Sequence, residues 1–406
     1  MTAPAARKSP AAPAARKSPA APAAEAAPRE IYLIGNTVDE LGGVTAWTHQ
    51  MARLFRRHGH PVHVIGVHEA ALKLTLPGPP DYPVTALYPS HPPTARPLVG
   101  RRRLSPAARL RERRRLAAKA AAVDRLSGIL GQAAPGAVAV VTQVWPMEWL
   151  RQADTSRVRL IGMSHESYAY TRACHRYRWV KENYPHVDRW LVLTQEDADD
   201  WITLDSMQNV GAMPNALAHL PATPSPRTGR NVVSIGRLAD QKGVDMLLDT
   251  WALVAPHRPE WRLRVYGAGE DETALKNQCT SLGLDTSVEW MGRTDDVPAA
   301  LAEGSVFVQS SRGEGFPLAL MEAMASGVPC AAFDCAPGVR EIVRDGEDGL
   351  LAPPGDLDSL ADRLLRLTGE KELRDTMGDR ARVNVQRFSE AHVLEQWEAL
   401  FRLLDR

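Results

Sequence analysis

Four charged side chains in the second half of the chain are candidates for holding a ligand that carries both phosphate and hydroxyl groups: Arg237, Lys242, Glu314 and Glu322. Arg237 ends a predicted strand and Lys242 begins the helix that follows, so both cations should lie at the ligand edge of a parallel sheet. Two desolvated cations at that edge would be costly unless an anion joined them. Carboxylates repel phosphate but accept hydrogen bonds from hydroxyl groups.

Residues 305–327 predict the structure that positions the two glutamates. An apolar run indicates a short buried strand. A tight loop follows, and Pro317 suits the first position of a helix. The first N–H groups of that helix, at Leu318 and Ala319, have no partner within it and attract phosphate. One loop could therefore hold a nucleotide sugar end to end, although two solvated glutamates at an ordinary helix start remain the alternative.

The same segment resembles the Glu-x7-Glu signature of the retaining glycosyltransferases of family 4, which have the two-domain GT-B fold. Glu314-Gly315-Phe316-Pro317 opens the match and Glu322-Ala323-Met324-Ala325 closes it. The resemblance implies that Glu314 contacts the donor sugar and Glu322 the ribose. It implies that the backbone between them, at Gly315, Phe316, Leu318 and Ala319, completes the donor site.

A second match surrounds the two cations. Gly236-Arg237-Leu238, followed by Lys242-Gly243, resembles the Gly-Arg-Leu-x-x-x-Lys-Gly pattern of the same family. The resemblance implies that Arg237 and Lys242 clamp the donor diphosphate. It also places the loop that contains Arg293 beside the donor base.

Positions that follow strands in the first half are further candidates. Gly42 and Gly43 come after a predicted strand and let the backbone approach a ligand at the start of the next helix. His165 lies just beyond the carboxyl end of another strand, where α/β folds bind ligands. A local loop contact is the alternative for His165. The resemblance implies that the glycine pair faces the donor phosphates and that His165 reaches the donor sugar, with Glu166 a weaker candidate beside it.

The composition is that of a globular protein. The 406 residues suffice for two domains, with 44% hydrophobic and 24% charged residues and a formal net charge of +1. The charge favours no particular partner. Four cysteines show no Cys-x-x-Cys pairing, so we expect reduced thiols and no zinc site. No apolar stretch approaches the length of a membrane span.

The fold class that we expect is α/β, with two Rossmann-like doubly wound domains facing across a cleft and a C-terminal helix crossing back. Residues 1–29 repeat Ala, Pro, Arg, Lys and Ser and predict a disordered tail. Residues 30–215 predict the acceptor-binding domain, and a Pro-rich linker follows. Residues 216–388 predict the nucleotide-sugar-binding domain, and residues 389–406 the helix that packs back.

A basic stretch lies between residues 101 and 119. We interpret residues 77–106 as a surface loop and expect a helix from about 105 to 130, with Arg111, Arg115 and Lys119 on one face. A solvated face is one reading. The other is a site for an anionic or polyprenyl-diphosphate-linked acceptor, or for an acidic membrane surface. No aromatic residues interleave with these cations, which argues against nucleic acid.

We expect no metal and no cofactor beyond the donor substrate. Asp197-Ala198-Asp199 and Asp356-Leu357-Asp358 have the Asp-x-Asp spacing of metal motifs, but each sits at a predicted helix start, where such residues cap. The function that we predict is transfer of a hexose or N-acetylhexosamine from a nucleotide-diphosphate sugar, with UDP favoured, to a glycan, lipid-linked or wall-polymer acceptor. The expected location is cytoplasmic, with a peripheral membrane contact open. A small-molecule acceptor, a GT-B epimerase or phosphorylase, and a non-catalytic nucleotide-sugar-binding protein are the alternatives.

Overall fold

The computed structural model describes residues 28–71, 73–74, 76, 78–95 and 105–405. The predicted tail up to residue 27 and the cations Arg101 to Arg103 lie outside these residues.

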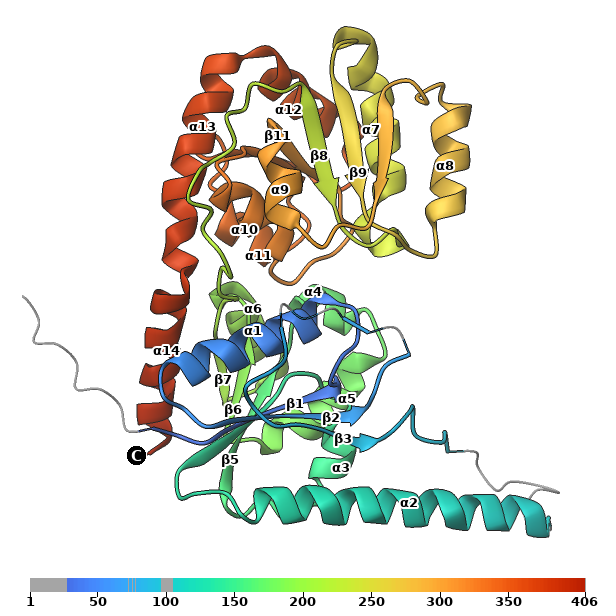
Figure 1. Cartoon of the computed structure of the whole chain (residues 1–406), viewed down its shortest axis with the longest axis vertical. Helices are drawn as coiled ribbons and strands as arrows, with labels where there is room; N and C mark the ends of the chain where they lie inside the picture. Colours follow the sequence, from blue (N-terminus) through green and yellow to red (C-terminus); the bar gives the residue numbers. More distant parts are fainter. Residues whose placement is uncertain (1–27, 72, 75, 77, 96–104, 406) are drawn as a thin grey trace, which may run out of the picture.

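Two parallel sheets form the frame of the molecule, one in each half of the chain (Figure 1). The first sheet has the order β3-β2-β1-β4-β5-β6-β7 and the second the order β10-β9-β8-β11-β12-β13. The strands of the first sheet are β1 Ile31–Thr37, β2 Val62–His68, β3 Val84–Tyr88, β4 Ala137–Val141, β5 Val158–Met163, β6 Arg189–Val192 and β7 Val210–Ala212. Those of the second are β8 Asn231–Ile235, β9 Arg262–Tyr266, β10 Val288–Gly292, β11 Val306–Gln309, β12 Cys330–Phe333 and β13 Gly349–Ala352.

Helices connect the strands. In the first half they are α1 Gly43–Arg57, α2 Pro106–Leu130, α3 Met147–Leu150, α4 Tyr168–Arg172, α5 Arg176–Asn183 and α6 Gln195–Asp205. In the second half they are α7 Val244–Val254, α8 Glu272–Ser281, α9 Val297–Ala302, α10 Leu318–Ala325, α11 Pro337–Ile342, α12 Leu357–Gly369, α13 Lys371–Asn384 and α14 Glu390–Leu404. The doubly wound α/β prediction is confirmed.

Local sequence explains these elements. Every residue of β4 is buried, as an apolar run covered on both faces requires. Thr194 caps α6, because its hydroxyl accepts a hydrogen bond from the Asp197 N–H at 3.0 Å. Asp356 caps α12 in the same way through the Ser359 N–H, at 3.0 Å. Both aspartate pairs therefore begin helices, as predicted.

In each sheet the strand order reverses beside the first strand of that half, between β1 and β4 and between β8 and β11. At each reversal, the connections that follow the two adjacent strands run to opposite faces of the sheet. This opens a crevice at the carboxyl ends of the strands, where ligands bind in this class of sheet. The two crevices belong to one cavity between the halves, described below.

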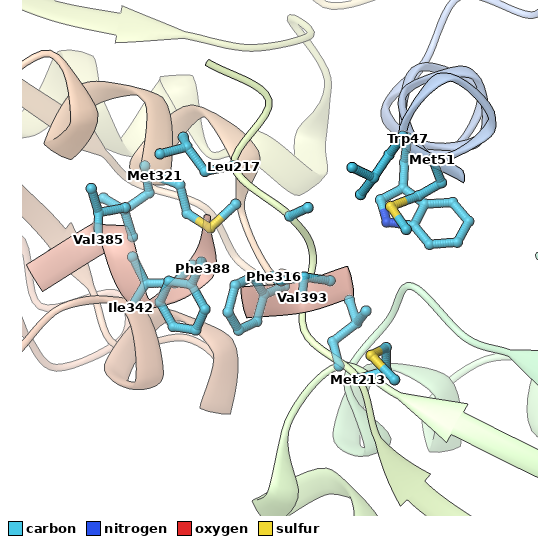
Figure 2. Close-up of a cluster of buried hydrophobic side chains, with 14 of the residues drawn as sticks. Trp47, Met51, Met213, Leu217, Phe316, Met321, Ile342, Val385, Phe388 and Val393 are labelled. Atoms are coloured by element: carbon cyan, nitrogen blue, oxygen red, sulfur yellow. The ribbon is translucent and has the colours of Figure 1, made fainter. Parts of the chain in front are cut away.

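A hydrophobic cluster joins the two halves (Figure 2). It contains Trp47 and Met51 from the first half, Leu217 from the linker, and Phe316 and Phe388 from the second. The rings of Phe316 and Phe388 meet edge to face at 5.1 Å. Only the start of the linker, at Ala216 and Leu217, is buried in this cluster, whereas most of residues 218–230 are exposed.

The last helix, α14, runs from the second half back onto the first (Figure 1). The ring of Trp397 packs edge to face on Phe55 of α1, with centroids 5.6 Å apart. His60 Nε2 lies 2.7 Å from Glu398 Oε1. The crossing helix predicted for residues 389–406 is thus present, while the domain limits at 215 and 388 stay predictions.

Two local predictions were wrong. The segment 77–106 contains β3, an edge strand, where we expected only loop. The sequence of this strand lacks the usual pattern because proline-rich segments flank it and only Leu87 within it is fully buried. Pro317 is the N-cap of α10 and not its first residue, with the helix beginning at Leu318.

The predicted basic helix is present as α2, but only part of its apolar face packs against the rest of the protein. Its C-terminal part packs through Val123, Leu126 and Leu130, whereas Leu110 and Leu116 are half exposed. Figure 1 shows the helix lying along the outside of the first half, away from the second. None of the helices in the described part of the chain has the length and apolar character needed to cross a bilayer.

Candidate active site

A cavity of about 2180 Å³ lies between the two halves of the molecule. The carboxyl ends of strands from both sheets supply its walls, because each sheet opens its crevice toward the other. All sequence-predicted site residues line it: Gly42, Gly43, His165, Glu166, Arg237, Lys242, Arg293, Glu314, Gly315, Phe316, Leu318, Ala319 and Glu322. Residues from distant parts of the sequence are therefore brought to one place, as the prediction required.

An ion pair joins the loops after β8 and β11 at the centre of the second half's wall. Lys242 Nζ lies 2.6 Å from Glu314 Oε1. The Ser311 hydroxyl donates to the same oxygen at 2.6 Å. The Glu314 carboxylate is buried, whereas Lys242 is about one-third exposed toward the cavity. The lysine can therefore approach a ligand anion while Ser311 continues to hold the glutamate.

The turn that carries Lys242 needs glycine. Gly243 has φ of +61°, and a Cβ there would meet the Ser310 carbonyl oxygen at 2.2 Å. That close approach lets the Ser310 hydroxyl donate to the Gly243 carbonyl at 2.8 Å. The loops after β8 and β11 are thus locked together, which fixes the position of the lysine relative to Glu314.

Arg237 is the second cation of this wall and is held loosely. Its guanidinium pairs with Glu270 at 2.6 Å, and both side chains are more than half exposed. An exposed pair of this kind contributes at most about 1 kcal/mol. A phosphate entering the cavity can therefore take Arg237 from Glu270 at little cost.

Two helix N-termini line the cavity from opposite halves. Residues Gly42 and Gly43 begin α1, and Leu318 and Ala319 begin α10. Neither helix has a side-chain cap, so the orphan N–H groups and the positive end of each helix dipole remain available to an anion. A Cβ at Gly42 or Gly43 would meet nothing within 4 Å, so the protein itself does not require glycine there. The open space beside α1 is room for a ligand.

Glu322 and His165 show the electrostatic character of the cavity. Among the described residues, the Glu322 carboxylate has no side-chain partner, and burial raises its pKa to about 7. Burial lowers the pKa of His165 to about 4, so its imidazole is neutral near neutral pH. Its Nε2 is buried and lacks a hydrogen-bond partner within the described chain, and its ring packs against the edge of Trp47 at 4.7 Å. Both groups can therefore bind polar atoms of a ligand.

Glu166 and Arg293 are less engaged with the centre of the site. Glu166 pairs with Arg176 at 2.6 Å, and burial is the largest cause that raises its pKa. Arg293 lies in the loop after β10 at the rim of the cavity. Among the described residues, neither side chain forms a hydrogen bond or an ion pair with Lys242 or Glu314.

The sequence did not reveal several lining residues. Ser311 was read as part of a loop, yet it orients Glu314. Asn36 lies near the end of β1 in the cavity wall, and its Oδ1 is buried without a partner in the described part of the chain. Asn215 of the linker donates to the Phe316 carbonyl at 3.1 Å and so ties the two halves together beside the site. Strand-end position was the one available signal for Asn36.

Comparison with known proteins agrees with this geometry. Residues 229–370, which include β8 to β13, match the family model Glycosyl transferases group 1. Over its full length the chain is similar to the lipopolysaccharide outer core galactosyltransferase WaaB, with a TM-score of 0.68, 20% identity and coverage of 92% and 99% of the two chains. It is likewise similar to Anabaena HepE in complex with UDP and glucose, with a TM-score of 0.71, 16% identity and coverage of 92% and 100%. The fold is GT-B.

Curated relatives are more similar in sequence, each over somewhat more than half of this GT-B chain. An exopolysaccharide phosphotransferase of Streptomyces coelicolor is 38% identical over 221 residues, which are 53% of this chain and 23% of that protein. A poly(ribitol-phosphate) alpha-N-acetylglucosaminyltransferase of Staphylococcus aureus is 26% identical over 239 residues, 58% of this chain and 48% of that protein. The chain thus spans from about a quarter to about half the length of these two relatives.

Proposed function

We propose that this GT-B protein is a retaining glycosyltransferase of family 4. It moves a hexose or N-acetylhexosamine from a UDP-sugar to a glycan, lipid-linked or wall-polymer acceptor. The observation that carries the proposal is the convergence of Lys242, Glu314 and the start of α10 on one cavity. UDP is the favoured donor nucleotide because HepE, a neighbour in fold, was solved with UDP and glucose. Wall polymers are favoured acceptors because a relative is named for poly(ribitol-phosphate).

Each group has a role in stabilising the departing nucleotide. As the bond from the sugar C1 to the β-phosphate oxygen breaks, negative charge grows on the diphosphate. Lys242 and Arg237 meet that charge together with the amides at the starts of α1 and α10. One preorganised donor of this kind typically lowers the activation free energy by about 3–4 kcal/mol. As the phosphate enters, Lys242 exchanges its contact with Glu314, and Arg237 its contact with Glu270, for contacts with the phosphate.

The two glutamates hold the hydroxyl-bearing ends of the donor. Glu322 accepts hydrogen bonds from the ribose, which fits a carboxylate that has no side-chain partner among the described residues. Glu314 contacts the donor sugar, with Ser311 fixing its orientation. His165, neutral near pH 7 because burial lowers its pKa, lies on the opposite wall and hydrogen-bonds the same sugar.

Retention follows from reaction on one face of the sugar. The acceptor hydroxyl attacks C1 from the side that the diphosphate leaves, and its proton passes to the departing phosphate oxygen. A new bond from C1 to the acceptor oxygen replaces the broken one, and UDP is released. No cofactor enters this scheme, and we propose that the reaction is independent of metal ions.

UDP release measures the reaction. The chain is incubated with UDP-glucose, UDP-galactose, UDP-N-acetylglucosamine and UDP-N-acetylgalactosamine, each with and without poly(ribitol phosphate) or poly(glycerol phosphate), and in the presence of EDTA. Acceptor-dependent release with one donor, and an α-linked product by NMR, is expected. Donor binding in a thermal-shift assay without turnover on any acceptor would point to a non-catalytic nucleotide-sugar-binding protein. The absence of binding by every UDP-sugar would overturn the proposed donor.

Peripheral contact with the inner face of the membrane is a further part of the proposal. Arg111, Arg113 and Arg114 of α2 are exposed, and Leu110 and Leu116 are half exposed beside them. Near-surface cations contribute about 1 kcal/mol each on an anionic leaflet. Co-sedimentation with vesicles containing phosphatidylglycerol, lost in an Arg111→Ala, Arg113→Ala, Arg114→Ala variant, is the expected result. Equal binding to neutral phosphatidylcholine vesicles would contradict it.

A further inference from the structure

The half of the cavity that belongs to the first sheet contains a cluster of aromatic rings with no role in donor binding. His68 ends β2, and His91 and Trp145 lie in the loops after β3 and β4, so the carboxyl ends of three strands within the β3-β2-β1-β4 part of the sheet place them in one cavity. The His91 and Trp145 rings are stacked at 5.4 Å, with 19° between their planes. Trp149 meets Trp145 edge to face at 5.0 Å. These four residues, with Tyr88, are called the aromatic wall.

The wall keeps part of its ring surface outside the hydrophobic core, although Trp149 belongs to that core and Trp145 packs against it. Trp149 is buried, but Trp145 is only half-buried and His91 is exposed. No partner for the Trp145 indole N–H is recorded among the described residues. His68 Nδ1 and His91 Nδ1 each lie near a backbone carbonyl, at 2.7 and 2.8 Å. Because a carbonyl can only accept, Nδ1 of each ring donates to it, and Nε2 remains available to a ligand.

Charged side chains at the edge of the wall are already paired. Lys119 Nζ is 2.7 Å from Glu148 Oε1 and lies 5.7 Å from the Trp149 ring centre. Arg115 makes a two-bond contact with Glu112, at 2.7 and 2.9 Å. Lys119, Glu148 and Arg115 line the cavity. The edge therefore offers both donors and acceptors without a net charge.

The cavity is larger than a nucleotide sugar needs. Pockets for ligands of that size are typically about 300–1,000 Å³. The cavity measures about 2180 Å³, and the donor-binding candidates Lys242, Glu314 and Glu322 come from the second half. The volume beside the aromatic wall is thus left for a second ligand that shares the cavity.

We propose that the aromatic wall binds a pyranose ring in an uncharged part of the acceptor, with Trp145 stacking on the ring. This proposal rests on the proposed glycosyltransferase function. A pyranose has an apolar C–H face and a rim of hydroxyl groups, which match a half-buried indole bordered by paired donors and acceptors. An anion would have to break an ion pair to reach either Lys119 or Arg115, and both cations are less than one-fifth exposed, in contrast to Arg237. A flat hydrophobic ligand would leave the charged edge unsatisfied.

This inference changes the expectation drawn from the basic helix. Arg115 and Lys119 stand on the cation-rich face of α2, which favoured an anionic acceptor. In the structure, carboxylates from α2 and α3 neutralise both cations. Where the acceptor is a charged polymer, a pyranose unit attached to it occupies the aromatic wall, and neither its phosphate nor an acyclic alditol such as ribitol does.

Fluorine NMR of the full chain labelled with 5-fluorotryptophan tests the proposal. Loss of one resonance in Trp145→Phe assigns Trp145. The labelled protein is titrated with maltose, cellobiose, lactose and chitobiose, then with sorbitol, which has hydroxyl groups but no ring, and with glycerol 3-phosphate as an anion. We expect a saturable shift of the Trp145 resonance with at least one disaccharide and none with sorbitol. Glu148→Gln should weaken the disaccharide affinity by about 3–10-fold, the effect of one hydrogen bond.

The other outcomes refute the proposal. A Trp145 shift with glycerol 3-phosphate alone would make the wall an anion site, and equal shifts with sorbitol and disaccharides would show non-specific polyol binding. No shift with any disaccharide would also overturn it. Binding of UDP is measured in parallel by thermal shift. UDP binding without a disaccharide response removes the aromatic-wall proposal alone, whereas loss of both responses removes the proposed function as well.

Discussion

Lys242 Nζ and Glu314 Oε1 lie 2.6 Å apart although 72 residues separate them in the chain. If Lys242 stabilises the departing diphosphate, Lys242→Ala should lower turnover by about 10²–10³-fold, as loss of one preorganised donor does. The remaining Ser311 hydroxyl still holds Glu314, so the fold should persist. Initial rates of UDP release and circular dichroism measure the two effects.

The matched control for Lys242 is Arg312, a cation in the same loop region that does not line the cavity. Its guanidinium pairs with Asp245 at 2.6 Å. Arg312→Ala should therefore leave turnover within about twofold, because an exposed pair contributes under about 1 kcal/mol. Equal losses in the Lys242 and Arg312 variants would indicate a general disturbance of the loops and would remove the assigned role of the lysine.

Glu322 should make both stability and nucleotide binding depend on pH. Burial raises its pKa from 4.5 to about 7. Between these values the folded state binds more protons than the unfolded state, so the free energy of unfolding falls as pH rises through this window. In the Glu322→Gln variant, the fall in the free energy of unfolding with rising pH should be smaller by about 1–3 kcal/mol. Urea unfolding at about pH 5 and about pH 8 measures it.

The same group predicts the pH dependence of UDP affinity. An ionised carboxylate accepts hydrogen bonds from both ribose hydroxyls, so UDP should bind the wild-type chain up to about tenfold more tightly at about pH 8 than at about pH 6. Titration of the UDP phosphate affects the Glu322→Gln variant equally and is subtracted by comparing the two profiles. Parallel profiles in calorimetry would show that Glu322 does not contact the nucleotide.

The cavity wall formed by the second half was predictable because its sequence signals are local. Arg237, Lys242, Glu314 and the start of α10 each follow a strand within a few residues, and the carboxyl ends of parallel strands must meet at one edge. The sequence could not show that Lys242 is paired with Glu314 while Arg237 is paired with Glu270. Those partners depend on how two loops pack, and the spacing of the residues carries no information about it.

The aromatic wall was not predictable for a different reason. His68, His91 and Trp145 stand far apart in the sequence, and each taken alone is an ordinary strand-end residue. Strand β3 was missed, so its following loop with His91 had no assigned place. The helix at residues 105–130 was predicted, but the sequence did not show that packing holds Val123, Leu126 and Leu130 and leaves Leu116 half exposed.

Arg340 of α11 and Glu196 of α6 connect the two halves by two contacts, of 2.6 and 3.1 Å. Glu196→Arg should separate the halves and raise the donor KM by about 2–5-fold, the effect of an exposed pair. The double variant Glu196→Arg, Arg340→Glu should restore it. X-ray scattering should detect an increased radius of gyration in the single variant only. No recovery in the double variant would show that this pair does not control closure.

Gly315 sets how closely the halves can approach. A Cβ at this position would lie 2.0 Å from the His165 carbonyl oxygen, which belongs to the opposite wall and to rigid backbone at the end of β5. Gly315→Ala should therefore push the walls apart, and we expect turnover to fall by at least about tenfold while both domains remain folded.

Gly128→Ala is the control, because a Cβ there meets nothing within 4 Å and lies within α2. That change should stabilise the chain by about 0.5–1 kcal/mol and leave turnover intact. Wild-type kinetics in Gly315→Ala would mean that catalysis tolerates a wider cavity than the one observed.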